Sequence, residues 1–255
     1  MSKKVALITG GMGGIGTAIC RQLHADGHVV ATTFTNPEKR ERWLAANPAL
    51  AAHTYPCDIT DWDSCAALQE KITGELGQVD ILVNNAGIQH TARVEDFPRD
   101  KWDDILAINL SSAFHASAAV LPDMRQNNYG RIINIASAHG LVASKEKAAY
   151  VSAKHAMVGL TKVVALENAE VDITCNAICP GWVLTPLVQA QIDKIAASQK
   201  ISNEAATETL LQEKQPSRRF TRAEDVAAAV LFLLSPAGDN MTGSCLTMDG
   251  GWTSQ

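Results

Sequence analysis

The sequence predicts an α/β fold in which a central parallel sheet of seven strands is flanked by helices. Short β-rich runs alternate with longer helical patterns along the whole chain, which is typical of repeated βαβ units. The β-rich runs are almost continuously apolar, as expected when helices cover both faces of a parallel sheet. A glycine-rich turn follows the first run and precedes the first helical pattern. These observations together favour a doubly wound domain of the Rossmann type.

The predicted elements follow one another in a regular order. The first strand contains KVALIT and leads into the glycine-rich turn, which opens the first helix. The runs DILVN, RIINIA and DITCNAI mark the fourth, fifth and sixth strands. We predict strands at Lys4–Thr9, Val29–Phe34, His53–Pro56, Asp80–Asn84, Arg131–Ala136, Asp172–Ile178 and Ser244–Met248. We predict helices between them at 14–26, 37–46, 61–76, 99–127, 148–169 and 222–235.

Length and composition favour a single dinucleotide-binding and catalytic domain over residues 1–255. No Pro/Ser-rich linker or charge block divides the chain. The longest connection runs from Pro180 to Arg222 and contains amphipathic helical patterns at Thr185–Gln199 and Asn203–Gln212. Long insertions after the carboxyl end of a strand are often substrate-binding elements. We therefore expect a helical substrate lid at 185–215, with a purely structural helical pair as the alternative.

Charge and cysteine content bear on the class and location of the protein. The formal net charge of −5 argues against a nucleic-acid or anionic-membrane surface, which needs clustered basic residues. No apolar run approaches the roughly 18 residues of a spanning helix, and Met1–Lys4 leads into a strand rather than a signal peptide. The six cysteines lack paired CxxC spacing, which favours buried thiols in a reducing cytosol. We therefore predict a soluble cytoplasmic protein without a metal site.

The glycine-rich turn predicts a dinucleotide site. It reads TGGMGGIG over Thr9–Gly16, with Gly10, Gly14 and Gly16 in a Gly-x-x-x-Gly-x-Gly spacing. Glycines at such positions permit a tight turn and let the backbone approach a pyrophosphate, which binds at the positive end of the following helix. A glycine-rich turn without a ligand is the alternative, and the flanking strand and helix argue against it.

The end of the second predicted strand bears on the choice between NAD and NADP. An acidic residue there binds the ribose 2′-hydroxyl of NAD, whereas basic residues accept the 2′-phosphate of NADP. No Asp or Glu directly follows Phe34, while Lys39 and Arg40 could reach a phosphate or pair with neighbouring glutamates. Asp58, after the third strand, could accept from the adenine amino group or cap a helix. We favour NAD and leave NADP open.

A tyrosine, a lysine and a serine are the candidate proton-transfer residues. Tyr150 and Lys154 lie four apart on a predicted helix and share one face, so the ammonium can lower the pKa of the phenol. Ser137 follows the apolar run of the fifth strand and could hydrogen-bond the same reacting oxygen. A chance coincidence at these spacings is the alternative. His139 and Lys147, within the same stretch, could carry the identity of the substrate.

Taken jointly, these motifs resemble those of the short-chain dehydrogenase/reductase family. The resemblance covers essentially the whole chain and includes NNAG at Asn84–Gly87, YxxxK at Tyr150–Lys154 and the pair Pro180–Gly181. It implies that Tyr150 is the general acid/base and that Ser137 fixes the reacting oxygen. It further implies that Lys154 holds the nicotinamide ribose and that Asn109 supports a water-linked proton route. The cofactor-binding residues it implies are Gly10, Met12, Gly14, Ile15, Gly16, Phe34, Asp58, Ile59, Asn85, Ala86, Gly87, Tyr150, Lys154, Pro180, Gly181, Val183, Thr185 and Leu187.

A narrower resemblance concerns the substrate. The words NNAGIQH, INLSSAFH, NIASAHGLVAS and DGGWT are similar to those of bacterial D-3-hydroxybutyrate dehydrogenases, which interconvert (R)-3-hydroxybutyrate and acetoacetate. The resemblance implies an apolar wall at Trp182 and Trp252, with Ser137 and Tyr150 at the reacting oxygen. The residues it implies for the substrate carboxylate are Gln89, His139, Lys147 and Gln191. Taken singly, each has a plain alternative, such as a solvated lysine or a core tryptophan.

Two other functions stay open at this point. The opening segment TGGMGGIGTAIC and the stretch KRERW look more like NADPH-dependent acetoacetyl-CoA reductases, which would need an open thioester channel and no anion site. A non-catalytic dinucleotide-binding sensor is the second alternative, although such proteins often lose the tyrosine or lysine that this chain keeps. The family resemblance also implies a homotetramer, and the long apolar faces at 99–127 and 148–169 suit this assembly.

Overall fold

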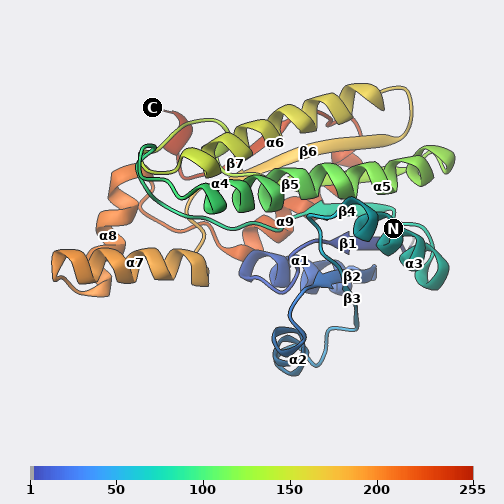
Figure 1. The fold of residues 1–255 in the computed structure, drawn as a ribbon. Coiled ribbons are helices and arrows are strands. Elements are labelled where there is room, and N and C mark those ends of the chain that lie inside the picture. Colours follow the sequence, from blue (N-terminus) through green and yellow to red (C-terminus); the bar gives the residue numbers. More distant parts are fainter. Residues whose placement is uncertain (1–2, 255) are drawn as a thin grey trace.

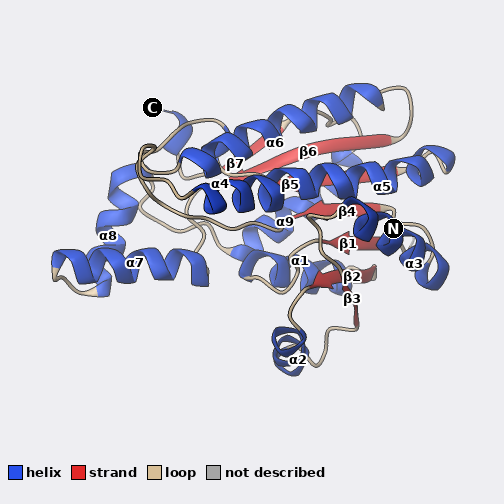
Figure 2. Cartoon of the chain, viewed as in Figure 1, coloured by secondary structure: helices blue, strands red, loops and turns tan. Residues whose placement is uncertain are grey.

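The computed structural model describes residues 3–254, apart from the side chain of Leu187, and it confirms the predicted architecture. One sheet of seven parallel strands has the order β3-β2-β1-β4-β5-β6-β7 (Figures 1 and 2). The strands are β1 (Val5–Ile8), β2 (Val29–Phe34), β3 (Ala52–Pro56), β4 (Ile81–Asn84), β5 (Gly130–Ile135), β6 (Ile173–Pro180) and β7 (Cys245–Met248). The helices are α1 (Gly14–Ala25), α2 (Pro37–Ala46), α3 (Trp62–Leu76), α4 (Arg99–Leu106), α5 (Ser112–Gln126), α6 (Ala148–Glu167), α7 (Pro186–Gln199), α8 (Asn203–Lys214) and α9 (Ala223–Leu234).

Helices cover both faces of the sheet, which explains the continuously apolar strands. Successive side chains of a strand point to opposite faces, so Leu7 and Ile8 of β1 belong to different core clusters. The cluster around Ile8 includes residues of α1 and α9, which pack against each other. The cluster around Leu7 includes residues of α3, α5 and α6. Both faces are therefore buried, as a parallel sheet requires.

The strand order reverses direction at β1, which positions the site. β1 pairs with β2 on one side and β4 on the other, with Leu7 opposite both Ala31 and Leu82. The connections on the two sides of such a reversal run in opposite directions, and they leave a crevice at the carboxyl ends of the strands. Functional residues that follow β1, β4, β5 and β6 are thereby brought to one edge of the sheet.

The long helix predicted at 99–127 is interrupted, which corrects the sequence prediction. One π-helical turn, Ala107–Ser111, separates α4 from α5. Within it the side-chain amide of Asn109 binds both backbone groups of Ile88: Oδ1 accepts from N at 2.8 Å and Nδ2 donates to O at 2.9 Å. Single π turns are commonly found at functional sites, and this one ties the helix to the loop after β4.

The same stretch also bears on the expectation that no segment spans a membrane. By length and composition alone, Arg99–Gln126 is apolar enough to cross a membrane, although 44% of its most apolar 18-residue window is buried. Core helices of soluble proteins pass the same test, and α5 contributes Ala116, Val120 and Met124 to the core beside β5.

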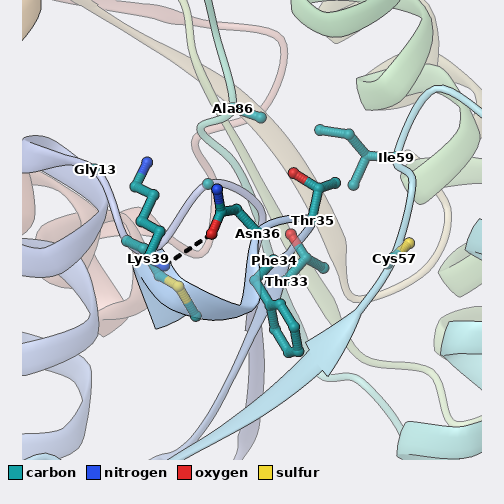
Figure 3. A pocket seen from close by; sticks show the side chains of 11 residues that line it. Gly13, Thr33, Phe34, Thr35, Asn36, Lys39, Cys57, Ile59 and Ala86 are labelled. Carbon is teal, nitrogen blue, oxygen red and sulfur yellow. Dashed lines mark hydrogen bonds between the residues drawn. The ribbon is translucent and has the colours of Figure 1, made fainter. Parts of the chain in front are cut away.

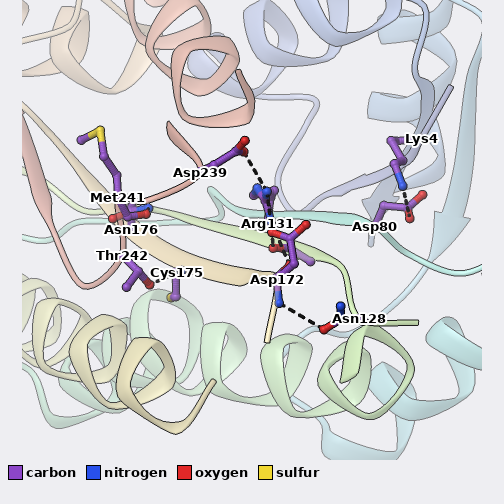
Figure 4. A network of polar contacts seen from close by, with 11 residues as sticks. Lys4, Asp80, Asn128, Arg131, Asp172, Cys175, Asn176, Asp239, Met241 and Thr242 are labelled. Atoms are coloured by element: carbon purple, nitrogen blue, oxygen red, sulfur yellow. Dashed lines mark hydrogen bonds and ion pairs between the residues drawn. The ribbon is translucent and has the colours of Figure 1, made fainter. Parts of the chain in front are cut away.

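A polar network closes the opposite edge of the sheet (Figure 4). Arg131 is only 2% exposed, and its guanidinium pairs with Asp172 at 2.8 Å and with Asp239 at 2.9 Å. Lys4 pairs with Asp80 at 3.3 Å, and the Asp80 carboxylate also accepts from the backbone N–H of Val5 at 2.9 Å. Buried charges need such partners, so these ion pairs stabilise the fold at the amino ends of the strands.

Truncating a core residue of β5 should reveal how strongly the sheet depends on its two buried faces. Ile133 is 1% exposed, and Ile133→Ala should lower the free energy of unfolding by about 2–5 kcal/mol because it leaves a cavity. Val94 is 77% exposed, so Val94→Ala should change it by less than about 0.5 kcal/mol. Urea denaturation measures both, and equal losses in the two variants would contradict this picture of the core.

Candidate active site

A cleft of about 670 Å³ opens at the carboxyl ends of β1, β4, β5 and β6. Its walls come from the loops that follow these strands and from the first residues of α1, α6 and α7. The cleft is lined by all the predicted cofactor residues except Phe34 and Leu187, and by all the predicted substrate residues. Phe34 lines a smaller adjoining pocket, and the side chain of Leu187 lies outside the described residues.

The glycine-rich turn has the shape that a dinucleotide requires. Gly10 has φ +64°, and a Cβ there would lie 2.8 Å from Cα of Ala86. A Cβ on Gly16 would lie 2.4 Å from the carbonyl oxygen of Gly10. α1 begins at Gly14 without a side-chain cap from Gly13, so its first N–H groups and positive end are available to an anion. These positions require glycine, and together they fit a bound pyrophosphate.

Side chains after β4 clamp this turn in place. The Asn85 amide donates to the carbonyl oxygens of Thr9 at 3.1 Å and Gly10 at 3.0 Å. The Thr9 hydroxyl accepts from the backbone N–H groups of Asn85 and Ala86 at 3.1 and 3.2 Å. The NNAG segment therefore shapes the cofactor wall through backbone contacts.

Figure 3 shows the pocket at the end of β2. NAD and NADP would be distinguished here, because they differ in the substituent at the ribose 2′ position. Thr35, Asn36 and Lys39 line the pocket, and none of its described lining residues carries a carboxylate. The Asn36 side chain accepts from the backbone N–H of Lys39 at 2.9 Å and caps α2. Arg40 turns away, because its Nε donates to the Thr54 hydroxyl at 2.6 Å and its head pairs with Glu41.

Asp58 lines the main cleft beyond this pocket. Its carboxylate accepts from the Thr60 backbone N–H at 2.9 Å and hydroxyl at 2.7 Å, and these bonds lower its pKa. The residue that caps α3 is Asp61, whose side chain accepts from the N–H of Ser64 at 2.7 Å. Asp58 is therefore an ionised acceptor facing the cleft rather than the cap of that helix.

The predicted proton-transfer residues meet between β5 and α6. Burial raises the pKa of the Tyr150 phenol, and the neighbouring Ser137 hydroxyl partly offsets this rise. Lys154 is 3% exposed, and its ammonium donates to the Ile135 carbonyl oxygen at 2.7 Å. That ammonium lies 5.7 Å from the centre of the Tyr150 ring. Burial lowers the pKa of Lys154 to about 8.

Asn109 lies beside this group but outside the lining of the cleft. It is fully buried, and its side-chain amide is occupied by the backbone of Ile88. Asn109 thus holds the loop after β4 in place, and Gly87 and Gln89 of this loop line the cleft.

Three buried donors line the cleft. Nζ of Lys147, Nε2 of Gln89 and Nε1 of Trp182 have no hydrogen-bond partner among the described residues. Lys147 is 7% exposed, and its ammonium lies 4.6 Å from the centre of the Trp182 ring. Burial lowers its pKa to about 8, while Glu213 opposes and Lys214 adds to this shift. Buried unpaired donors are costly, so this end of the cleft fits a ligand rich in acceptors.

Aromatic rings wall this end. Trp182 and Trp252 are both buried, with ring centres 5.5 Å apart. His139 meets the Trp252 ring edge-on at 4.9 Å and the Tyr150 ring at 5.8 Å. Trp182 also joins an apolar cluster with α7 and α8, including Val188, Ile192 and Leu210. The predicted helical pair thus packs directly against the wall of the cleft.

Two residues that support the site were not predicted from the sequence. Gln215 holds the loop after β6, because its side-chain oxygen accepts from the backbone N–H of Trp182 at 2.9 Å. Ser144 contacts Nε2 of His139 at 2.9 Å. Both lie in irregular segments, where no periodic pattern indicates the partner of a side chain, although Ser144 ends the motif NIASAHGLVAS.

Comparisons with known proteins agree with this geometry. A family model described as enoyl-(acyl carrier protein) reductase matches residues 10–253. The chain is 45% identical to a D-beta-hydroxybutyrate dehydrogenase of Cupriavidus necator over the full length of both chains. It is 44% identical to the enzyme of the same name from Rhizobium meliloti, with 99% of each chain covered. A crystal structure of actinorhodin polyketide ketoreductase with NADPH shares 32% identity and a TM-score of 0.92, covering 99% of this chain and 98% of that one.

The family assignment follows from these matches together with the dinucleotide-shaped turn and the Ser137, Tyr150 and Lys154 cluster. The chain belongs to the short-chain dehydrogenase/reductase family of oxidoreductases.

Proposed function

We propose that this protein interconverts (R)-3-hydroxybutyrate and acetoacetate by using a nicotinamide dinucleotide. The observation that carries the proposal is the set of unpartnered buried donors on Lys147, Gln89 and Trp182, at the end of the cleft that holds Tyr150. The names of the two similar dehydrogenases support the same substrate.

A small hydroxy acid would be recognised at this end of the cleft mainly by its charge rather than by burial of its carbon chain. Each buried CH₂ of a ligand contributes about 0.8 kcal/mol, so a four-carbon chain gains little from the tryptophan wall. A charge pair at 4 Å near a protein surface has a Coulomb energy of about 4 kcal/mol before desolvation. Lys147 has already lost most of its solvent in the free protein. We therefore assign the carboxylate to Lys147, Gln89, His139 and Gln191, with Trp182 and Trp252 around the carbon chain.

The chain's own residues would hold the dinucleotide along the rest of the cleft. The N-terminus of α1 and the glycines around it would bind the pyrophosphate, and Asp58 and Ile59 would lie on the adenosine side. Lys154 would bind the ribose near the reacting centre, facing Pro180, Gly181, Val183 and Thr185 across the cleft. When bound, the nicotinamide accepts or supplies the hydride.

Proton transfer falls to Tyr150. Because burial raises its pKa, the phenol is protonated at neutral pH and can donate to the ketone oxygen of acetoacetate. In the reverse direction the phenolate accepts the proton from the hydroxyl of 3-hydroxybutyrate. Ser137 would hold the same oxygen by a hydrogen bond. The ammonium of Lys154, 5.7 Å from the centre of the Tyr150 ring, would stabilise the phenolate when it forms. Asn109 would hold the loop after β4 that carries Gln89.

The sequence favours NAD, and the composition of the pocket after β2 supports NADP as a second cofactor. Thr35, Asn36 and Lys39 line this pocket, which would receive the ribose 2′ substituent, and none of its described lining residues carries a carboxylate. NAD needs an acidic acceptor at this position, whereas a 2′-phosphate needs donors and a cation. We therefore propose that the enzyme accepts NADP at least as well as NAD.

Assembly as a cytoplasmic homotetramer also stays a proposal. The apolar side chains Phe114 of α5 and Val163 and Leu166 of α6 are 49%, 51% and 78% exposed. Exposed apolar faces on neighbouring helices suit contacts between subunits. All six cysteines are free thiols in this structure, as expected in a reducing compartment.

Removing the phenol of Tyr150 should abolish turnover. Tyr150→Phe should lower kcat for 3-hydroxybutyrate oxidation by about 10²–10⁴-fold, the usual contribution of a general acid/base. The dinucleotide affinity, measured by fluorescence titration, should stay within about twofold because the phenyl ring keeps its packing. Turnover that survives at every pH would contradict the role of Tyr150.

Lys147 should control substrate affinity. Lys147→Ala should raise KM for 3-hydroxybutyrate by about 10- to 100-fold, because a hydrogen bond to a charged group contributes about 1.5–3 kcal/mol. The matched control is Lys145→Ala, because Lys145 is exposed and does not line the cleft. An unchanged KM in the Lys147 variant would refute the carboxylate site.

The pH dependence of KM gives a second test of the same site. Burial lowers the pKa of Lys147 to about 8, so the ammonium is charged below this pH and loses its proton above it. KM for 3-hydroxybutyrate should therefore rise as the pH passes 8. Lys147→Arg should remove this rise, since a guanidinium keeps its charge.

Lys39 should contribute to the dinucleotide preference. Lys39→Ala should raise KM for NADP about two- to fivefold and leave KM for NAD unchanged, because an exposed ion pair is worth about 0.5–1 kcal/mol. Arg42→Ala is the control, since Arg42 is exposed on the same helix but lines neither pocket. Equal effects on both dinucleotides would rule out a 2′-phosphate contact.

A further inference from the structure

Gln215, the residue at which α8 ends, is a buried polar residue outside the lining of the cleft. It is 1% exposed, and all of its polar groups are hydrogen-bonded. Its backbone N–H donates to the Leu211 carbonyl oxygen, and its own carbonyl oxygen accepts from the N–H of Arg218, both at 2.8 Å. Its side-chain Oε1 accepts from the backbone N–H of Trp182 at 2.9 Å, and Nε2 donates to the carbonyl oxygen of Arg219. The side-chain amide therefore joins the end of α8 to the loop after β6.

Two glycines leave room for this side chain. A Cβ on Gly181 would lie 2.6 Å from Oε1 of Gln215, and a Cβ on Gly250, which has φ +61°, would lie 2.7 Å from its Cγ. Gly250 belongs to the turn after β7, and its carbonyl oxygen accepts from the N–H of Ser217 at 3.0 Å. The same turn leads to Trp252. The Gln215 side chain therefore lies where three segments meet: the end of α8, the loop after β6 and the turn after β7.

Trp182 is held in place through its backbone. Its N–H donates to Gln215, and its carbonyl oxygen accepts from the N–H of Thr221 at 2.9 Å. Its indole N–H has no hydrogen-bond partner among the described residues, so no side-chain hydrogen bond orients the ring there. The Lys147 ammonium lies 4.6 Å from the centre of this ring. A shift of the Trp182 backbone would therefore displace both the aromatic wall and the ring over which the ammonium lies.

We propose that Gln215 is a positioning residue: its side-chain amide ties the end of α8 to Trp182 and to the turn that carries Trp252, and thereby sets the affinity for the substrate. This inference rests on the proposed function and deepens it. Packing supports the tie, because Leu210 and Leu211 of α8 belong to the same apolar cluster as both tryptophans. Gln215 acts through the two rings and does not itself line the cleft.

The position needs both a donor and an acceptor. The N–H of Trp182 requires an acceptor, and the carbonyl oxygen of Arg219 requires a donor, so an amide satisfies both. Gln215→Met keeps a side chain of similar length but satisfies neither group. Gln215→Glu keeps the acceptor, but it directs a second oxygen at the Arg219 carbonyl unless the carboxyl is protonated.

Charged neighbours determine where such a carboxyl would titrate. Arg219, Arg222, Asp225 and Asp249 line the open pocket beside Gln215. Arg222 pairs with Asp225, so their charges largely cancel. Asp249 would raise the pKa of an introduced carboxyl, while solvent screens the opposite effect of exposed Arg219. Because burial raises this pKa as well, the carboxyl of Gln215→Glu should titrate above the usual range of a glutamate.

Fluorine-19 NMR of the protein labelled with 5-fluorotryptophan tests the tie in the absence of substrate. The chain has five tryptophans, so the signals of Trp182 and Trp252 are assigned by their loss in Trp182→Phe and Trp252→Phe. We expect both signals to shift in Gln215→Met and the other three to stay. The matched control is Gln212→Met, because Gln212 is exposed on α8 and lies outside the cleft. Unchanged Trp182 and Trp252 signals in Gln215→Met, or equal shifts of all five, would overturn the proposal.

A pH titration of Gln215→Glu provides a rescue that a merely structural role would not show. Each spectrum is compared with the wild type at the same pH, because the Lys147 ammonium beside Trp182 titrates as well. At about pH 8 the carboxylate repels the Arg219 carbonyl, and both tryptophan signals should shift as in Gln215→Met. At about pH 5 the protonated acid can donate to that carbonyl, and the signals should return to their wild-type positions. A shift that does not depend on pH would overturn the proposal.

Kinetics give the third readout. Gln215→Met should raise KM for 3-hydroxybutyrate by about three- to tenfold, the size expected for the loss of one or two neutral hydrogen bonds. The values of kcat and of KM for the dinucleotide should stay within about twofold, because the aromatic wall binds substrate and transition state alike. Gln212→Met should leave all three unchanged. A loss of kcat with an unchanged KM for 3-hydroxybutyrate would overturn the proposal.

Failure of the proposed function would look different. If the wild type does not oxidise 3-hydroxybutyrate, the proposed function fails, while the fluorine signals of the free protein still decide whether Gln215 positions the two tryptophans. If Gln215→Met does not fold, the titration of Gln215→Glu decides the same question.

Discussion

The parallel pairing of β1, β4, β5 and β6 is the constraint on which the rest of the structure depends. It places the carboxyl ends of four strands at one edge, so that the glycine turn, NNAG, Ser137 and the loop after Pro180 meet around a single cleft. The register is reinforced inside the sheet, where the amide of Asn84 donates to Asn134, its partner on β5, at 2.8 Å. Asn134 in turn donates to the hydroxyl of Thr161 at 2.8 Å, which fixes α6 over β5 and thereby sets Tyr150 and Lys154 against Ser137. A one-residue slip would turn these side chains to the opposite face.

Two buried lysine ammonium groups make the active site electrostatically unfavourable in the free protein. The ammonium groups of Lys147 and Lys154 are both almost fully buried, and burial lowers the pKa of each to about 8. Lys154 keeps a backbone acceptor in Ile135, whereas the Lys147 ammonium lies over the face of Trp182 and has no hydrogen-bond partner among the described residues. A buried cation without an acceptor destabilises the fold unless a ligand supplies one. The opposite edge of the sheet differs in kind, since buried Arg131 there is neutralised by two aspartates of the chain itself. The buried charge of Arg131 at the amino ends of the strands is thus paired within the chain, whereas that of Lys147 in the cleft has no acceptor among the described residues.

Most of the fold could be predicted from the sequence because its signals are local. The apolar strands, Pro37 at the start of α2 and the glycine turn before α1 each follow from nearby residues, and their elements appear within a few positions of the predicted ones. The π-helical turn at Ala107–Ser111 could not be predicted, because it depends on Asn109 meeting Ile88 across the fold. Tyr150 and Lys154 were predictable from helical spacing, and their meeting with Ser137 followed from the parallel sheet. The partners of single groups were not: Lys154 donates to the Ile135 carbonyl, and Arg40 turns towards Thr54 instead of the cofactor pocket. Such choices depend on irregular loops, which have no repeating pattern to read.

A cleft that recognises a small free carboxylate should distinguish between two substrates that carry the same ketone. Acetoacetate and acetoacetyl-CoA present the same ketone. Only acetoacetate has a free carboxylate next to it that could pair with the unpartnered ammonium of Lys147. With either reduced dinucleotide followed by absorbance, kcat/KM for acetoacetate should exceed that for the thioester by about tenfold or more, because one charged hydrogen bond is worth about 1.5–3 kcal/mol. A higher kcat/KM for acetoacetyl-CoA would contradict the account and identify the protein as a thioester reductase.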